Sequence, residues 1–226
     1  MRTRRSLLRT GALASLGVVG AIAVAPSPPN ATPLDRTVDA TESPDAVAEW
    51  TDKPITGEAE TPIVRYQYRK ADGDVNRTDF DDFVATAPIN VVFVPDDDIE
   101  SDGLERVMSI LTDEGWLRAP EEYTRYGWDR DEERFVRQQA TAADAYYGTS
   151  GRLHVRCWSF EGIVSMQAHE DTGARPKHGI ASYERGRTAM EAIYADAGWD
   201  VSPTEIDLDN DQRDHDGQAT VITEAT

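Results

Sequence analysis

The chain contains a single cysteine, three lysines and no apolar run long enough to cross a bilayer comfortably. The cysteine, Cys157, cannot form an intramolecular disulfide, and it excludes any zinc site built from several cysteines. The longest apolar run, Ala12–Ala25, is shorter than the ~20 residues of a membrane-spanning helix. A domain without disulfides depends on its hydrophobic core, and the segment from Ile63 to Leu208 is long enough to supply one.

Basic residues are also few. The chain has 23 Lys and Arg and 42 Asp and Glu, which gives a formal net charge of −19. The first 25 residues contain four arginines and no acid, so the remainder carries 19 − 42 = −23. The acids are spread along the chain between aromatic and aliphatic residues, which favours a folded, salt-adapted surface over a disordered acidic tail. At molar ionic strength, salt screens the repulsion between these acidic side chains within ~3 Å. This charge argues against nucleic acid as a partner.

The first 25 residues have the form of an export signal. Paired Arg4 and Arg5 precede Leu7 and Leu8, and the short apolar run follows. A charged start followed by a short apolar segment is typical of a signal peptide, and the arginine pair indicates the twin-arginine route. The segment resembles the twin-arginine leaders of haloarchaea; the alternative is a Sec signal with incidental arginines. We therefore expect the protein outside the cell or on the outer face of the cytoplasmic membrane.

Cleavage of this leader has two candidate positions. Ala23-Val-Ala25 has the small-x-small form but is followed by Pro26, and Ala21-Ile-Ala23 is the alternative. Membrane contact is expected only if the leader stays uncleaved.

Behind the leader, the composition predicts three further segments. Residues 26–61 read as a disordered linker, 62–208 as one α+β domain, and 209–226 as an acidic tail. The expected domain has a mostly antiparallel sheet covered by two or three helices. Its strand candidates are 63–68 and 89–94.

The helix candidates rest on capping and periodicity. Asp102-Gly-Leu-Glu105 predicts a helix start, with Leu104, Val107, Met108 and Leu111 on one stripe and Gly115 after its end. A second helix is expected to end at Gly198-Trp199, and a third from about 129 to 147. Gly103–Trp116 and Gly186–Trp199 match at an offset of 83 residues. Either a duplication or two unrelated helices with the same stop signal explains this pseudo-repeat.

Residues 153–169 predict a β-hairpin with a two-residue turn at Glu161-Gly162. In that register, paired positions sum to 323, so His154 lies opposite His169 and Arg156 opposite Gln167. Because side chains alternate between the two faces, one face is core: Leu153, Val155, Cys157, Val164, Met166 and Ala168. The other face is the candidate site: His154, Arg156, Trp158, Gln167 and His169.

Three interpretations of this polar face stay open. It is solvated or packed under a helix; it binds a phosphate or carboxylate through the histidines and Arg156; or it binds a divalent metal. For the metal, His154 and His169 would be ligands, with His178 as third nitrogen and Glu170 or Asp171 as an oxygen. Three protein ligands plus water are typical of catalytic zinc.

Other catalytic chemistry is poorly supported. The predicted alternation points Cys157 away from both histidines, which disfavours a Cys–His pair. Gly148-Thr-Ser-Gly151 lacks the spacing of a nucleophile elbow, and no glycine-rich phosphate loop is present. Asp207-x-Asp-x-Asp211 begins like a calcium loop but lacks its glycine and glutamate.

Several of these segments together resemble the LssY-type C-terminal domain. They are 89–94, the helix before Gly115-Trp116, Gly151-Arg-Leu-His-Val-Arg-Cys-Trp158, and Arg175-Pro-Lys-His178 before the helix that ends at Trp199. The resemblance implies a shared architecture, and it singles out His154, Arg156 and Trp158.

The scarcity of catalytic motifs predicts a non-catalytic binding module for a small-molecule or cell-envelope ligand. The alternative is a metal-dependent hydrolase centred on His154, His169 and His178.

Overall fold

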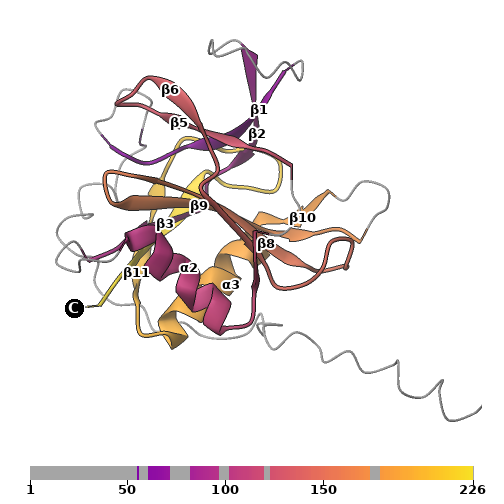
Figure 1. Cartoon of the computed structure of the whole chain (residues 1–226), viewed down its shortest axis with the longest axis vertical. Coiled ribbons are helices and arrows are strands. Elements are labelled where there is room, and N and C mark those ends of the chain that lie inside the picture. Colours follow the sequence, from indigo (N-terminus) through magenta and orange to yellow (C-terminus); the bar gives the residue numbers. More distant parts are fainter. Residues whose placement is uncertain are drawn as a thin grey trace, which may run out of the picture.

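The computed structural model describes residues 55, 61–71, 82–96, 102–119, 123–173 and 179–225. The leader and most of the expected linker lie outside them. The described chain forms two sheets and two helices (Figure 1). The helices are α2 (Gly103–Asp113) and α3 (Tyr183–Asp196). The strands are β1 (Tyr66–Lys70), β2 (Phe83–Pro88), β3 (Val91–Val94), β4 (Leu117–Arg118), β5 (Tyr126–Asp129), β6 (Arg134–Arg137), β7 (Ala140–Ala143), β8 (Leu153–Phe160), β9 (Ile163–Asp171), β10 (Ile180–Ser182), β11 (Asp200–Asp207) and β12 (Gln218–Thr223).

The larger sheet has the order β11-β12-β3-β9-β8-β7-β4, with β10 paired to β9. Its strand pairs are antiparallel except β12 with β3, which is parallel. The smaller sheet, β2-β1-β5-β6, is antiparallel throughout. The α+β class and the mostly antiparallel pairing are therefore confirmed, whereas the second sheet was not expected. Among the described residues, no helix is both long and apolar enough to cross a membrane.

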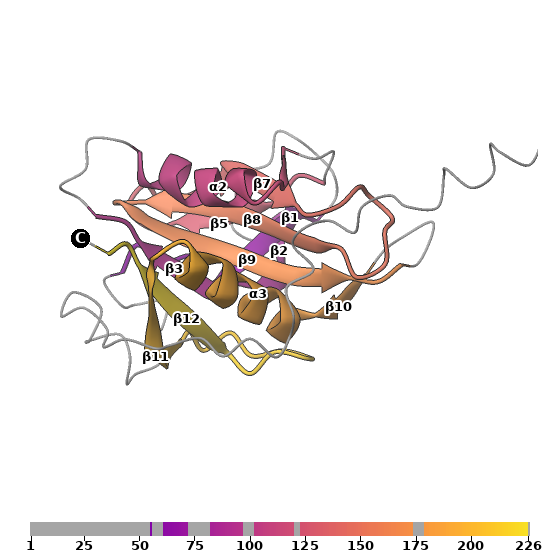
Figure 2. The same cartoon turned by 90° about the horizontal axis from the view of Figure 1, so that it is seen from below.

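The elements form three layers around the β8–β9 hairpin. Figure 1 shows the smaller sheet on one side of β8 and β9 and the two helices on the other, and Figure 2 shows the helices lying across the large sheet. The main hydrophobic core lies between the helices and the large sheet, with Val107, Met108, Val155, Met166 and Tyr194 among its buried members. A second core on the opposite face contains Ile89, Val92, Trp158 and Val221.

The predicted helix start and the two predicted helix ends have a visible cause. The Asp102 side chain accepts from the Leu104 amide at 2.9 Å, and the predicted stripe of α2 is buried. After α2, Gly115 has φ +84°, and the Trp116 amide donates to the Leu111 carbonyl. After α3, Gly198 has φ +89° and Trp199 donates to Tyr194 in the same way. These are two Schellman ends, which explains the matched Gly-Trp pairs without a ligand.

The hairpin prediction is confirmed in register. β8 and β9 pair from Leu153 with Glu170 to Phe160 with Ile163, and His154 lies opposite His169. Glu161 and Gly162 have φ +48° and +82°, the two positive values that a type I′ turn needs. The six predicted core residues of the hairpin are buried against the helices. Cys157 is among them, with its sulfur 3.9 Å from that of Met108, and burial raises the pKa of its thiol.

The third helix, predicted over 129–147, is wrong. Its residues form the β5–β6 turn, β6 and β7. Phe135 packs against Phe83, Tyr68 and Trp128, so the aromatic and β-branched residues of β6 serve the small sheet. The alanines of β7 fit beside β8 in the large sheet, where packing overrides their helix propensity.

The expected acidic tail over 209–226 is also corrected. Its Gln218–Thr223 is strand β12, which lies between β11 and β3 with Ala219, Val221 and Ile222 fully buried. The β-branched stretch Thr220-Val-Ile-Thr223 inside an acidic segment was the signal for this strand. At the other end, Ile55 belongs to the packed part, because it is buried and its amide bonds to the Asp207 carbonyl.

At Gly186, helix α3 lies close against the backbone of β9 in the large sheet. A Cβ atom there would lie 2.4 Å from the His169 amide nitrogen and 2.5 Å from the Ala168 carbonyl carbon. Gly186→Ala is therefore expected to lower the free energy of unfolding by roughly 2–3 kcal/mol, since backbone cannot yield as a flexible side chain does. Urea unfolding in molar salt measures it.

Gly179→Ala is the matched control. Its added Cβ would meet only the Thr172 hydroxyl oxygen, at 3.9 Å, so unfolding should change little. Equal effects of the two substitutions would show that the α3 contact does not limit stability.

Candidate metal centre

The polar face of the hairpin is buried, which contradicts one of the three interpretations left open, that it is solvated or packed under a helix. His154, Arg156, Trp158, Gln167 and His169 are each at most 4% exposed. The cover is the smaller sheet, which contacts this face through β1, β5 and β6 (Figure 1). Side chains that alternate along a strand reach opposite layers, so both faces of β8 and β9 are interior.

Trp158 holds the two sheets together. Its indole Nε1 donates to the Val136 carbonyl of β6 at 3.1 Å. Gly127 of β5 lies over the ring, where a Cβ would come within 2.7 Å of Trp158 Cδ1. The glycine thus permits a close crossing, and Trp158 has a structural role.

Arg156 reaches the same layer but a different strand. Its Nη1 lies 3.4 Å from Oε1 of Gln67, a buried residue of β1. The guanidinium therefore faces the sheet-on-sheet interface, where it is out of reach of a ligand arriving from solvent.

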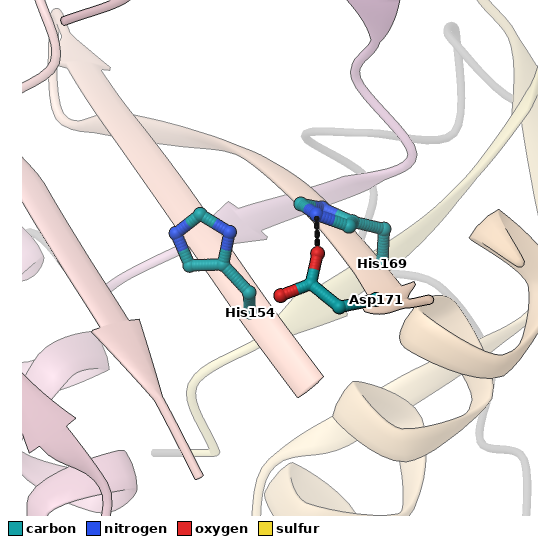
Figure 3. Close-up of side chains that lie close together, drawn as sticks. All are labelled: His154, His169 and Asp171. Carbon is teal, nitrogen blue, oxygen red and sulfur yellow. Dashed lines mark hydrogen bonds and ion pairs between the residues drawn. The ribbon is translucent and has the colours of Figure 1, made fainter. Parts of the chain in front are cut away.

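His154 and His169 face each other directly, and Asp171 joins them (Figure 3). The ring centroids lie 4.9 Å apart with planes at 76°. His169 Nε2 lies 3.0 Å from Asp171 Oδ1, two residues further along β9. One ligand atom from each of the three residues can be chosen so that all lie within 4.8 Å of one another. The three side chains are 0%, 3% and 2% exposed.

Two neighbours orient these groups. The Gln167 amide lies against His169 Nδ1, with Nε2 at 2.9 Å and Oε1 at 3.1 Å. An amide offers a donor and an acceptor, so Gln167 can serve either tautomer of the imidazole. Arg152 Nη1 donates to Asp171 Oδ2 at 2.9 Å, and its Nε donates to the Ala145 carbonyl. Such outer contacts are what hold metal ligands in place in known centres.

The structure decides between the two predicted oxygen ligands. Glu170 points to the opposite face, where it pairs with Arg185 at 3.0 Å, whereas Asp171 shares the face of His169. His178, the predicted third nitrogen, lies outside the described residues. Of the five hairpin residues predicted, the two histidines and Gln167 belong to this centre.

Arg152 and Asp144 were missed by the sequence reasoning. The hairpin register contained the signal for Arg152, because 152 and 171 also sum to 323. Asp144 carried no signal, since it lies just beyond β7. Its carboxylate accepts a hydrogen bond from the Leu153 amide at 2.9 Å. Burial raises the pKa of this carboxyl to about 6, although that hydrogen bond and the charge of Arg152 both lower it.

The charges of the centre select the ions it can hold. Its one carboxylate is already paired with the buried Arg152, so little net negative charge remains. Calcium and magnesium need several oxygen ligands, which these residues do not offer. Neutral imidazoles suit zinc, copper, nickel and iron. Ligands of one zinc ion lie about 3.4 Å apart, so the centre would close by an ångström or so.

Comparison with known proteins identifies no relative: no family model, no curated protein and no solved structure matches this chain.

The raised pKa of Asp144 sets a pH dependence. A carboxyl with a higher pKa in the folded chain contributes stability below about pH 4, and this is lost as the pH rises through about 6. Asp144→Asn keeps an acceptor for Leu153 and removes the charge. At about pH 8 it should raise the free energy of unfolding by roughly 1–2 kcal/mol, because part of the side chain reaches solvent and reduces the effect. Near pH 4 the two proteins should unfold alike.

Urea titrations at both pH values and constant salt make this measurement. The exposed Asp113→Asn is the control for a simple loss of negative charge. The same gain at both pH values, or an equal gain in the control, would contradict the assignment.

Proposed function

We propose that this chain is an exported, salt-adapted, non-catalytic binding domain that holds one divalent transition-metal ion at His154, His169 and Asp171. The observation that carries the proposal is the convergence of these three ligand groups on one buried face. The orientation of His169 by Gln167 and of Asp171 by Arg152 supports it.

Metal binding here requires rearrangement of one hydrogen bond. Asp171 is the acceptor for a proton on His169 Nε2, and the ion would take the place of that proton. His169 would then carry its proton on Nδ1, where Gln167 Oε1 lies at 3.1 Å as an acceptor. His169 therefore has a hydrogen-bond partner for its proton on either ring nitrogen, so it can change tautomer when the ion binds.

Burial favours binding over catalysis. A catalytic zinc site keeps one position open to water and substrate. Here the three side chains are at most 3% exposed, so a substrate would reach them only after the elements packed around them part. The hydrolase alternative thus lacks a position for its substrate in this arrangement.

Export and salt adaptation rest on the sequence. The arginine pair and apolar run support the twin-arginine route, and the −23 charge behind the leader supports a surface adapted to salt. The segments similar to the LssY-type C-terminal domain include β3, α2, β8 and α3. We propose that architecture for the α+β domain, with β12 as part of its large sheet.

The test is metal content. The full-length chain, prepared in molar salt, is dialysed with zinc and then washed, and its metal is measured by elemental analysis. We expect about one ion per chain in the wild type and nearly none in His154→Gln/His169→Gln. Zinc should also raise the melting temperature of the wild type alone, since an ion at 100 times its Kd adds about 2.7 kcal/mol.

His215→Gln is the matched control, because His215 lies outside the centre and bonds to Asn210. It should keep its metal. Far-UV circular dichroism establishes that each variant is folded, and the single His154→Gln replaces the double variant if that fails to fold. A folded wild type with neither bound metal nor a shifted melting temperature would refute the proposal.

A further inference from the structure

A second site lies on the helix side of the large sheet. A cleft of about 590 Å³ opens between the first half of α3 and the loop that joins β11 to β12. In Figure 2 this yellow loop runs below α3, at the end of the helix next to β10. The volume falls within the range of small-molecule sites.

The walls of the cleft are held by local bonds. Gln212 and His215 exchange both backbone hydrogen bonds, at 3.1 and 2.9 Å, so the loop contains a tight turn. On the other side, Asn90 Nδ2 donates to the carbonyls of Ala168 and Tyr183, and its Oδ1 accepts from the Ala168 amide. The cleft therefore exists before any ligand arrives.

His215 presents a hydrogen-bond acceptor there. Its side chain is 3% exposed, and its Nε2 lies 3.1 Å from Asn210 Oδ1. Asn210 uses its own Nδ2 for the carbonyls of Arg65 and Ile89, so its oxygen has to accept the His215 proton. Burial lowers the pKa of His215, which favours the neutral ring. Nδ1 is then left with a lone pair.

A second acceptor lies near that lone pair. Asp216 Oδ1 lies 3.9 Å from His215 Nδ1, too far for a direct bond. Two acceptors at this distance suit one ammonium group between them, which can donate to both.

The charge of the lining points the same way. Glu184, Asp214 and Asp216 line the cleft against one cation, Arg187. Arg187 is paired with Glu205 at 2.7 Å, outside the lining, and lies 3.8 Å from Asp216. This surplus of carboxylates repels anions and favours cations.

Gln212 favours a hydrogen-bond acceptor on the ligand, in addition to the cationic donor. Its Nε2 is buried and has no hydrogen-bond partner among the described residues. A buried donor left unsatisfied costs about 1–3 kcal/mol, so a rotation of the side chain that brings Nε2 to a ligand oxygen in the cleft would be favoured. The ligand must therefore offer both cationic donors and a neutral acceptor.

We propose that this cleft binds a small amino alcohol or amino sugar, whose ammonium group donates to His215 and Asp216 and whose hydroxyl accepts from Gln212. The site is independent of the metal centre, which lies on the other face of β9.

Glucosamine is the probe, at about pH 6 where its amine is protonated, with glucose as the uncharged counterpart. Calorimetric titration of the full-length chain should show one glucosamine bound per chain and at least tenfold weaker binding of glucose. Asp214→Asn/Asp216→Asn should weaken glucosamine binding at least tenfold. Both residues are exposed, so the fold should persist.

Asp113→Asn/Glu114→Gln changes the net charge equally at the exposed end of α2, and it should bind glucosamine like the wild type. Gln212→Leu should weaken binding without any change of charge. His154→Gln should leave it unaffected, which separates this site from the metal centre. No binding of glucosamine, equal binding of glucose, or equal losses in the two charge variants would overturn the proposal.

Discussion

The rest of the structure depends on the register of the β8–β9 hairpin. Its turn at Glu161 and Gly162 has the two positive φ values that set a two-residue connection, and every pairing from Phe160 outward follows. Because the hairpin is buried on both faces, this register decides which layer receives each side chain. A slip of one strand by one residue would turn its polar side chains into the helix-side core and its apolar side chains towards the polar layer: Arg156 and Val155 would exchange faces if β8 slipped, and His169 and Ala168 if β9 slipped. Neither layer could accept the exchange.

The polar layer is costly and must be satisfied internally. Arg152 and Asp171 are buried charges, and such a pair is tolerated only when further bonds complete it. Ala145 supplies one for the guanidinium, and His169 supplies one for the carboxylate. On the reverse of the same strand, Asn90 bonds the backbone of Ala168, and Gly186 brings α3 against it. Asn90, in the wall of the proposed cleft, thus bonds the strand that carries the proposed metal ligand His169.

Local patterns predicted the elements whose cause is local. Asp102 caps α2, Gly115 and Gly198 end the helices, and the alternation in the hairpin separates core from polar residues, all within a few residues of chain. The alanines of β7 misled the prediction because their helix propensity is weak against packing beside β8. β12 was missed because acids surround its short apolar stretch, and its place in the sheet depends on β3, which is distant in the chain, as well as on the neighbouring β11.

By itself, the amino-acid sequence determined the turn, the pairing of His154 with His169 and the face they share, since these follow from the two-residue period of a strand. It also contained the pairing of Arg152 with Asp171, because these positions sum to 323 like the other pairs of the hairpin. Only the tertiary structure decided that this face is covered by a second sheet, and that Asp171 rather than Glu170 completes the cluster in the interior. The cleft beside α3 likewise needs Asn90, Tyr183 and His215 from distant segments. Strand period is a property of neighbouring residues, whereas burial depends on which remote surfaces meet, and no local pattern encodes that.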